Sequence, residues 1–384
     1  MLDPTESLVG MRGVPSKLLA FGLLMLVFSE GRAGGQSPPE PPVKRLIEFG
    51  WDEPDTAFLR RNIEMIEKTP FDGCVFHVMT SNPEGRRENF TWLGWGRRAF
   101  RESDFQAALD DLKATPFRRF TRNFLRFNTA PGDLDWFDDY GAILGNARLA
   151  AKVARAGKCA GILFDVEEYE GGLFTYSMQR DAKSKSWDQY ADQAKRRGRE
   201  VMGAFQEGFP GLTVFLTFGH TLALVESDRG EKTLAESRYG LLAPFLDGMV
   251  EAAREGARIV DGFELSYGYR EPEKFDEGYR LMKEGVLPIV DDGPKYGRVV
   301  SAGFGLWLDY DWRKKGWDVD DPSKNYFTPD SFEASLRRAL ERSDEYVWIY
   351  TESPRWWSEG GKGIALPDAY ETAIRQARRG MTPD

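Results

Sequence analysis

The sequence predicts an α/β protein built as a single (β/α)8 TIM barrel with long strand-to-helix loops. From residue 44 onward, short runs with the composition of β-strands alternate with amphipathic helical stretches. Eight strand–helix units in alternation imply a parallel sheet, and eight is the number of strands that closes a TIM barrel. An open doubly wound sheet is the alternative. Such a sheet normally has a glycine-rich first turn, and Gly-Trp-Asp-Glu-Pro at 50–54 is not one.

The expected elements follow from hydrophobic periodicity. We expect strands at 45–49, 73–79, 123–128, 161–167, 213–220, 262–267, 300–309 and 346–352. We expect helices at 56–68, 104–114, 137–156, 187–208, 239–256, 273–284, 329–342 and 367–378.

The connections between these elements also indicate a barrel enzyme. Helix-to-strand links are short, as at 69–72, 115–119 and 157–160. Several strand-to-helix links are long: 80–103, 168–186, 221–238, 310–328 and 353–366. Barrel enzymes separate stability from function in this way, with tight turns on one face and long loops on the other.

The N-terminal segment is typical of a secretory signal peptide over residues 1–33. Arg12 and Lys17 form a basic region, an apolar run at 18–28 is too short to span a bilayer, and Gly31 and Ala33 suit a cleavage site. The alternative is an uncleaved membrane anchor. We expect a Pro-rich linker at 34–43, the barrel at 44–384, and a secreted or periplasmic protein with no membrane association after cleavage.

Composition narrows the class of partner. A formal charge of −9 argues against nucleic acid or an anionic membrane surface. Cys74 and Cys159 lie in apolar contexts and are expected as buried thiols rather than a disulfide. The sequence carries no zinc-protease, dinucleotide or P-loop motif, so we expect no cofactor and no bound metal. The oligomeric state is left open.

The most informative stretch is the fourth expected strand with the residues after it, 161–170. It begins as an apolar run and ends with four carboxylates in six residues. Alternation along a strand puts Leu163, Asp165 and Glu167 on one face. A salt-bridge cluster or a solvated strand end would also explain the pattern. At the mouth of a parallel barrel, it indicates a carboxylate-based active site.

Polar side chains recur near the ends of the other strands. If the more apolar face of each strand packs against helices, the opposite face points into the barrel. This rule sends inward Glu48, His77, Arg126, Asn128, Asp165, Glu167, Glu264, Ser266, Trp307, Asp309, Trp348, Tyr350 and Glu352. The fifth strand is ambiguous, although His220 ends it. Buried charges are costly unless paired, so Arg126 is expected to pair with Glu48 or Asp165.

The segment Phe164-Asp165-Val166-Glu167 resembles the Asp-x-Glu ending of strand four in chitinase-like barrels. The chain as a whole is similar in architecture to secreted glycoside hydrolases with (β/α)8 barrels. In that resemblance the glutamate, here Glu167, is the acid. The fuller Asp-x-x-Asp-x-Asp-x-Glu pattern is absent, because Gly161 and Leu163 occupy its upstream acidic positions. The Asn-Glu pair of another large barrel clan is absent too, so the resemblance implies no particular family.

Glycoside hydrolysis of a poly- or oligosaccharide is the leading hypothesis. That chemistry needs one carboxylic acid to protonate the departing oxygen and a second carboxylate as nucleophile or base. We expect Glu167 to be the acid, and Glu352, Glu264 and Asp165, in that order, to compete for the second role. The expected substrate-binding residues are His77, Arg126, Asn128, Glu168, His220, Tyr267, Trp307, Asp309, Tyr350 and Trp356.

Two other functions fit the same residues. A divalent-metal-dependent sugar isomerase or epimerase would bind its cation with Glu167, His220, Glu264 and Glu352. Loss of activity with a chelator would identify it. A non-catalytic carbohydrate-binding barrel would bind sugars without turnover. The sequence leaves open the sugar, the linkage and the stereochemical course.

Overall fold

The main strands form one parallel sheet in the order β10-β11-β1-β2-β5-β6-β7-β8-β9. The computed structural model describes residues 43–82, 84–357 and 364–381, so the predicted signal peptide and almost all of the predicted linker lie outside the described residues. The two end strands of the sheet are consecutive segments of the chain, separated by Gly303 alone. They fill one barrel position, which closes a ring of eight positions and confirms the predicted TIM barrel.

The strands of the ring are short. They are β1 (Arg45–Gly50), β2 (Gly73–Phe76), β5 (Phe124–Asn128), β6 (Gly161–Asp165), β7 (Thr213–Leu216), β8 (Arg258–Asp261), β9 (Val300–Ala302), β10 (Phe304–Trp307) and β11 (Tyr346–Thr351). Two small pairs lie outside the ring: β3 (Met79–Ser81) with β4 (Arg87–Asn89), and β12 (Pro354–Arg355) with β13 (Ile364–Ala365). A side chain at Gly303 would come within 3.1 Å of backbone oxygens of both flanking strands, which explains glycine at the break.

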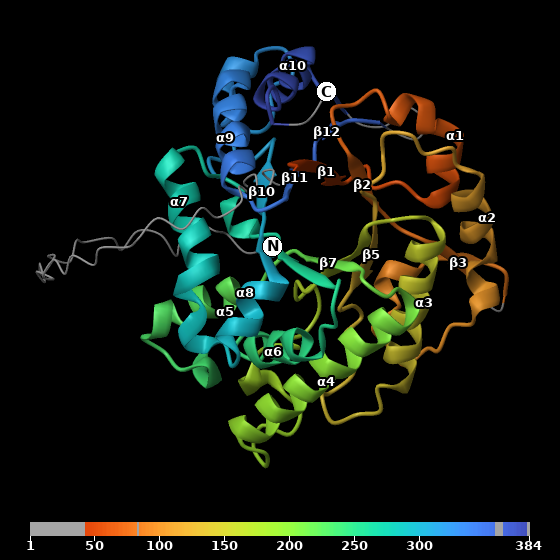
Figure 1. Cartoon of the computed structure of the whole chain (residues 1–384), viewed down its shortest axis with the longest axis vertical. Helices are drawn as coiled ribbons and strands as arrows, with labels where there is room; N and C mark the ends of the chain where they lie inside the picture. Colours follow the sequence, from red (N-terminus) through yellow and green to blue (C-terminus); the bar gives the residue numbers. More distant parts are fainter. Residues whose placement is uncertain (1–42, 83, 358–363, 382–384) are drawn as a thin grey trace, which may run out of the picture. The chain divides into compact units, whose positions relative to one another are not determined.

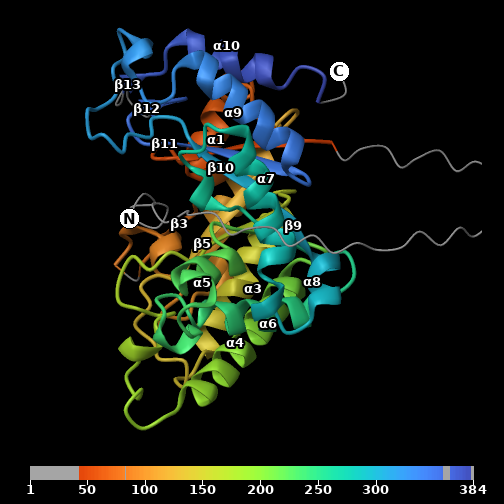
Figure 2. The same ribbon diagram turned by 90° about the vertical axis from the view of Figure 1, so that its left-hand side faces the viewer.

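Helices surround the strands (Figure 1). They are α1 (Thr56–Ile66), α2 (Gln106–Ala114), α3 (Gly141–Ala156), α4 (Trp187–Gly208), α5 (His220–Glu226), α6 (Leu242–Ala252), α7 (Pro272–Arg280), α8 (Gly293–Val299), α9 (Pro329–Arg342) and α10 (Asp368–Ala377). Helix α4 packs between α3 and α6 (Figures 1 and 2). Ser186 begins α4 through a capping box with Gln189. Within the described residues, no helix is long and apolar enough to cross a membrane.

The barrel interior is filled mainly by aromatic side chains. Phe124, Phe215 and Tyr346 lie with ring centroids 5.4–5.7 Å apart, and Trp348 packs above them, 6.4 Å from Phe215. Phe49 points into the same interior and lies 5.5 Å from Trp348. This aromatic core leaves the polar residues of the ring to the carboxyl ends of the strands.

The predicted inward position of Glu48 is wrong. Because Phe49 faces the interior, its neighbour Glu48 faces the helices, and it is fully buried there. The more apolar face was assumed to pack against helices, but here the aromatic interior receives it. Arg126 pairs with Asp165, the other predicted partner.

Several strands end earlier than predicted: the second stops at Phe76 and the fourth at Asp165, and the fifth and sixth differ more. The fifth stops at Leu216, and His220 begins α5. The sixth lies at Arg258–Asp261 rather than 262–267, and a 3-10 helix, η7, covers Glu264–Ser266. The alternation of apolar and polar residues at 262–267 mimics a strand. Phe263 breaks it with a left-handed backbone, φ 47° and ψ 57°.

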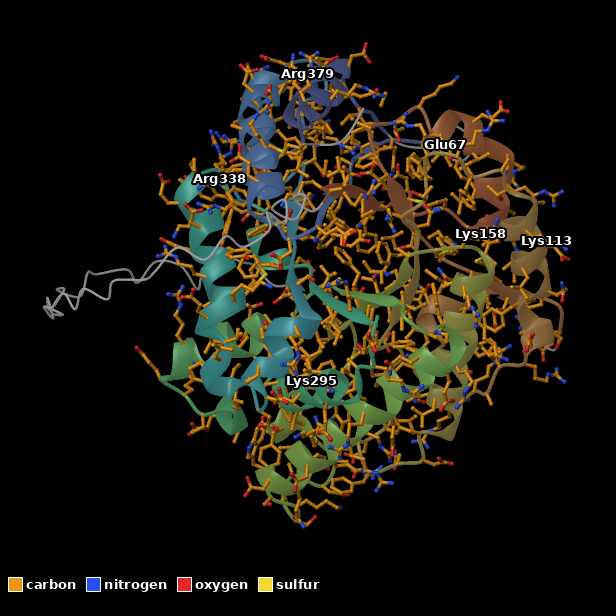
Figure 3. The ribbon with its side chains drawn as sticks, in the orientation of Figure 1. Glu67, Lys113, Lys158, Lys295, Arg338 and Arg379 are labelled. Carbon is orange, nitrogen blue, oxygen red and sulfur yellow. The ribbon has the colours of Figure 1, made fainter. Side chains whose placement is uncertain are left out.

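A carboxylate fastens the amino-end turns of the barrel. Glu67, labelled in Figure 3, follows α1, and its Oε1 accepts the backbone N–H groups of Arg118, Arg119 and Phe120 at 2.7, 2.8 and 3.1 Å. Arg119 donates back to the Glu67 carbonyl at 2.8 Å. The predicted buried free thiols, Cys74 and Cys159, are confirmed.

Candidate active site

Asp165 ends β6 and organises the acidic stretch that the sequence singled out. It is fully buried, and its Oδ1 accepts the Glu167 N–H at 3.1 Å and the Thr217 hydroxyl at 3.3 Å. Its Oδ2 accepts the Tyr169 hydroxyl at 2.8 Å and an Arg126 N–H at 2.7 Å. Asp165 therefore anchors the site, and its oxygens are occupied by the protein.

Arg126 on β5 is enclosed by protein groups. Its Nη1 lies 2.9 Å from Glu53 Oε2, and its Nε donates to Asn128 Oδ1 at 2.9 Å. The guanidinium lies between the rings of Phe49 and Trp92, 4.9 and 5.2 Å from their centroids. Burial opposes its charge, but Glu53 and Asp165 outweigh burial and hold the pKa of Arg126 well above its ordinary value. Arg126 thus positions its neighbours, a different role from the predicted binding of hydroxyls.

Glu53, in the loop after β1, is a site residue that the sequence reasoning missed. Its Oε1 lies 3.2 Å from Nδ1 of His77, which was predicted inside the second strand and comes directly after β2. Burial would raise the pKa of Glu53, but Arg126 and His77 lower it below its ordinary value. The signal was available, since Asp52 and Glu53 follow a strand end as Asp165 and Glu167 do.

Glu167 and Glu264 are the two carboxyl groups of the site that perturb each other. Burial and then Asp165 raise the pKa of Glu167, while Tyr169 and Arg126 oppose this shift. Burial and then Glu167 raise the pKa of Glu264 well above its ordinary value. Both side chains are half-buried. The pair is therefore more stable with one proton than with both groups ionised, and the proton is favoured on Glu264.

The loop that carries Glu264 is held by a second buried aspartate. Asp261 ends β8 and accepts the N–H groups of Gly219 and Phe263, both at 3.0 Å, and the Thr221 hydroxyl at 2.9 Å. The backbone N–H of Glu264 donates to the Thr217 carbonyl at 3.2 Å. These bonds stabilise the left-handed Phe263, a conformation that costs a bulky residue of the order of 1–3 kcal/mol.

Aromatic side chains form a wall beside the carboxylates. Tyr267 stacks on Tyr350 with centroids 5.5 Å apart and planes 18° apart, and Trp307 meets both rings edge-on. Burial raises the pKa of both tyrosines, so their hydroxyls remain protonated at neutral pH. A hydrogen bond from Tyr267 partly offsets the rise in the pKa of Glu264.

Glu352 belongs to a neighbouring group. Its Oε1 accepts the Tyr350 hydroxyl at 3.2 Å, and that hydroxyl accepts the Trp51 indole N–H at 2.8 Å. Burial and then Asp309 raise the pKa of Glu352. Asp309 itself accepts the backbone N–H groups of Glu352 and Ser353 at 3.0 and 2.8 Å, so it fixes the end of β11. Glu167 is among the groups that raise the pKa of Glu264 but not among those that shift the pKa of Glu352.

Three predicted binding residues have partners elsewhere. His220 Nε2 lies 3.0 Å from Asp247 on α6. Glu168 accepts the Phe174 N–H at 2.6 Å and lies 3.4 Å from Arg238. These two contacts shape the loop after β6. Trp356 donates its backbone N–H to Asp52 at 2.8 Å, and its ring meets buried Phe71 edge-on at 4.7 Å.

The four predicted metal ligands do not assemble. His220 is bound by Asp247, and Glu352 by Tyr350. Within the described ranges, no group of three or more His, Cys, Asp or Glu side chains has the arrangement of a metal site.

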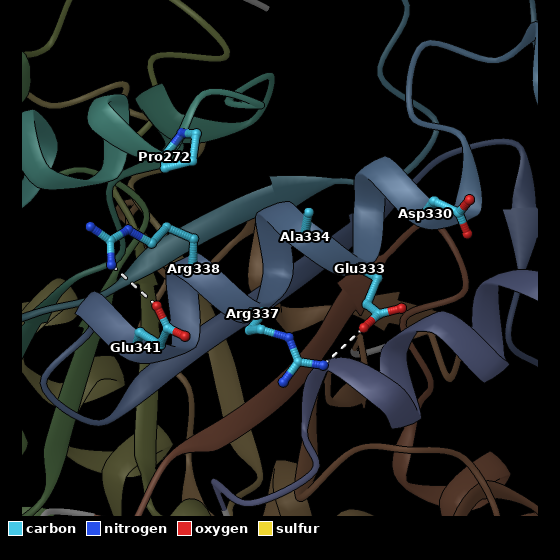
Figure 4. A pocket seen from close by; sticks show the side chains of 7 residues that line it. All are labelled: Pro272, Asp330, Glu333, Ala334, Arg337, Arg338 and Glu341. Atoms are coloured by element: carbon cyan, nitrogen blue, oxygen red, sulfur yellow. Dashed lines mark hydrogen bonds and ion pairs between the residues drawn. The ribbon is translucent and has the colours of Figure 1, made fainter.

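An open hollow of about 520 Å³ lies on the outer face of α9 (Figure 4). Its charged side chains pair with one another: Arg337 with Glu333 at 2.8 Å, and Arg338 with Glu341 at 3.1 Å. It is built from helix surface, and its lining includes none of the carboxyl groups at the strand ends. The carboxylate cluster is the stronger candidate.

Comparison with known proteins gives no match to a protein-family model and none to a curated protein. Among solved structures, a GH5_18 protein from Streptomyces cattleya in complex with GlcNAc is 12% identical, with a TM-score of 0.45 over 90% of this chain and 82% of that one. A glucosidase from Croceicoccus marinus is 11% identical, with a TM-score of 0.44 over 90% of this chain and 69% of that one. A sugar phosphate isomerase/epimerase from Parabacteroides distasonis is 8% identical, with a TM-score of 0.39 over 90% of this chain and 98% of that one. Likeness of this degree carries no information about activity.

Proposed function

We propose that the protein is a glycoside hydrolase in which Glu264 is the general acid and Glu167 is the second carboxylate. The observation that carries the proposal is the mutual perturbation of these two half-buried groups at the strand ends of one barrel. Two carboxyl groups with separated pKa values are what glycosidic bond cleavage requires.

The roles follow from the neighbours of each group. A tyrosine hydrogen bond and the charge of Arg126 lower the pKa of both groups, while burial and neighbouring carboxylates raise it. The rise is larger for Glu264, whose pKa burial, Glu167 and Asp165 hold well above its ordinary value, so Glu264 is the protonated member. This assignment differs from the expectation that Glu167 is the acid, because the strand pattern did not reveal the surroundings of Glu264.

In the proposed reaction, protonation of the glycosidic oxygen accompanies cleavage of the glycosidic bond. The Glu264 carboxyl gives its proton to the glycosidic oxygen, and the bond to the anomeric carbon breaks with its electron pair on that oxygen. The Glu167 carboxylate meets the developing positive charge at the anomeric carbon, directly in a retaining enzyme or through a deprotonated water in an inverting one.

The test compares Glu264→Gln and Glu167→Gln on two substrates. On a natural glycan, Glu264→Gln should lose about 10²–10⁴-fold in kcat/KM, and it should lose much less on a dinitrophenyl glycoside, whose leaving oxygen needs little protonation. Glu167→Gln should be impaired on both. Glu64→Gln, on an exposed position of α1, is the matched control.

Near wild-type turnover by either variant on the natural glycan would contradict the proposal. So would two variants with the same substrate dependence, since the roles would then not be separated. Assay of the wild-type enzyme with EDTA adds a further arm, because activity lost to the chelator and restored by Mn²⁺ or Mg²⁺ would point to the isomerase class instead.

A further inference from the structure

Three tryptophans in loops after the strands, Trp51, Trp92 and Trp312, are exposed although most large apolar side chains are buried. Trp51 and Trp92 are the two that contact residues around the carboxylate pair. Trp51 follows β1 and is 64% exposed, and Trp92 ends the 3-10 helix η2 (Phe90–Trp92) and is 39% exposed. Exposed indoles are costly in water, and their rings suit the apolar faces of sugar rings. Each of the two is held in place by a neighbour of the carboxylate pair.

Trp51 is fixed along one edge. Its indole N–H donates to the Tyr350 hydroxyl at 2.8 Å, and Tyr350 stacks on Tyr267, the hydrogen-bond partner of Glu264. In the ring, β1 lies opposite β7, which stands between β6 and β8. The strand end that carries Trp51 therefore lies across the barrel from the strand ends that carry the carboxylate pair.

Trp92 is fixed from the other direction. Its ring meets Tyr169 edge-on at 4.9 Å, and the Arg126 guanidinium lies 5.2 Å from its centroid. Tyr169 is 43% exposed, and it is the hydrogen-bonding neighbour of Glu167. Trp92 is thus linked to Glu167 through Tyr169, and Trp51 is linked to Glu264 through Tyr350 and Tyr267.

We propose that Trp51 and Trp92 are two sugar-binding platforms and that the substrate is an uncharged oligosaccharide long enough to contact both. This inference rests on the proposed function, because it places the platforms on either side of the cleaved bond. Each indole is pre-oriented by its neighbour, so little side-chain freedom is lost when a sugar ring stacks on it.

The charge of the cluster supports an uncharged substrate. Arg126 is balanced by Glu53 and Asp165, and Arg355 bonds the Glu352 carbonyl and lies 5.8 Å from the Trp51 ring. Against these two guanidinium groups stand six carboxyl groups: Glu53, Asp165, Glu167, Glu264, Asp309 and Glu352. A uronic acid or a sulfated sugar would add negative charge to a site that is already acidic.

Binding is measured by calorimetry on the otherwise complete Glu264→Gln protein, so that the ligand is not cleaved. The probes are neutral hexasaccharides of β-1,4-, β-1,3- and α-1,4-glucose, with hexagalacturonate as the anionic probe. In this background Trp51→Ala and Trp92→Ala should each weaken binding of the best neutral probe about five- to tenfold. Trp51→Phe should retain most of the affinity. The control is Trp187→Ala, at the start of α4.

A platform role would be overturned if both alanine variants bound the neutral probe like their parent, or if no neutral hexasaccharide bound. Preferential binding of hexagalacturonate would overturn the charge argument. Failure of the proposed function looks different: the wild-type enzyme would release no product from any glycoside, while tryptophan-dependent binding persisted. In an active enzyme, kcat/KM should rise with chain length, and the two alanine variants should lose that rise mainly through KM.

Discussion

Replacing Glu48 by Gln should stabilise the protein, increasingly so as the pH rises. Glu48 is fully buried between β1 and the helices, and neither of its carboxyl oxygens has a hydrogen-bond donor among the described residues. Asp52, Glu53, Cys74 and Arg355 face it. Burial, followed by Asp52, raises the pKa of Glu48 well above its ordinary value of 4.5.

The size of the effect follows from proton linkage. Below the unfolded-state pKa near 4.5, both the folded and the unfolded chain carry the Glu48 proton. Above it the unfolded chain loses the proton while the folded chain keeps it, so stability falls with rising pH until the folded-state pKa is passed. The slope is about 1.4 kcal/mol per pH unit, or about 2.7 kcal/mol from pH 5 to 7 if the folded state keeps its proton throughout.

Glutamine removes this dependence, because it is neutral in both states. Its amide can also donate to Asp52, in place of the hydrogen bond that protonated Glu48 makes to the same carboxylate. Urea unfolding of the wild type and Glu48→Gln at pH 5, 6, 7 and 8 measures the difference. Glu64→Gln, exposed on α1, is the control and should show a constant difference near zero. A difference for Glu48→Gln that does not grow with pH, or a destabilised variant, would refute the reasoning.

Three further outcomes are expected. Glu67→Ala should lower the free energy of unfolding by about 1–3 kcal/mol in urea, because three backbone N–H groups at 118–120 lose their acceptor; an unchanged urea midpoint would contradict this. In the wild type, kcat/KM on a natural glycan should fall with rising pH as Glu264 loses its proton, at a pH above its ordinary pKa of 4.5, and a dinitrophenyl glycoside should show a weaker fall. The mature protein should begin near Gly34, as N-terminal sequencing of exported protein would show; an intact residue 1 or 11 in a membrane fraction would contradict export.

Long periodic elements were readable from the sequence. The bounds of α4 (Trp187–Gly208) and α9 (Pro329–Arg342) match their predicted ranges because each begins at a capping residue followed by a strong amphipathic repeat. The short sixth strand was misplaced. A segment of six residues carries too little periodic signal to reveal that Phe263 adopts a left-handed turn, which Asp261 fixes through the folded structure.

The candidate site was predictable only in part. Strand alternation identified Asp165, Arg126 and Tyr350 as inward-facing, and the structure agrees. The same rule failed for Glu48, because it assumed an aliphatic outer face and could not anticipate an aromatic interior. His220 was chosen from its place after a strand. Its binding by Asp247 joins residues from two helices, which no local pattern encodes.

The two carboxylates of the proposed pair are positioned by the same local device. In each case an aspartate ends a strand, accepts a backbone N–H two residues later and so fixes the turn that presents the glutamate: Asp165 for Glu167, and Asp261 for Glu264. Both aspartates are buried and accept from the segment that follows β7, so neither can shift without losing several hydrogen bonds and each turn is stiff. Asp261 positions Glu264 and is not expected to contact the substrate. Asp261→Asn should nevertheless impair catalysis, because an amide cannot accept hydrogen bonds from Gly219, Phe263 and Thr221 together. Its kcat should fall while its KM stays near the wild-type value. A variant with unchanged kcat would show that Glu264 is positioned by something other than Asp261.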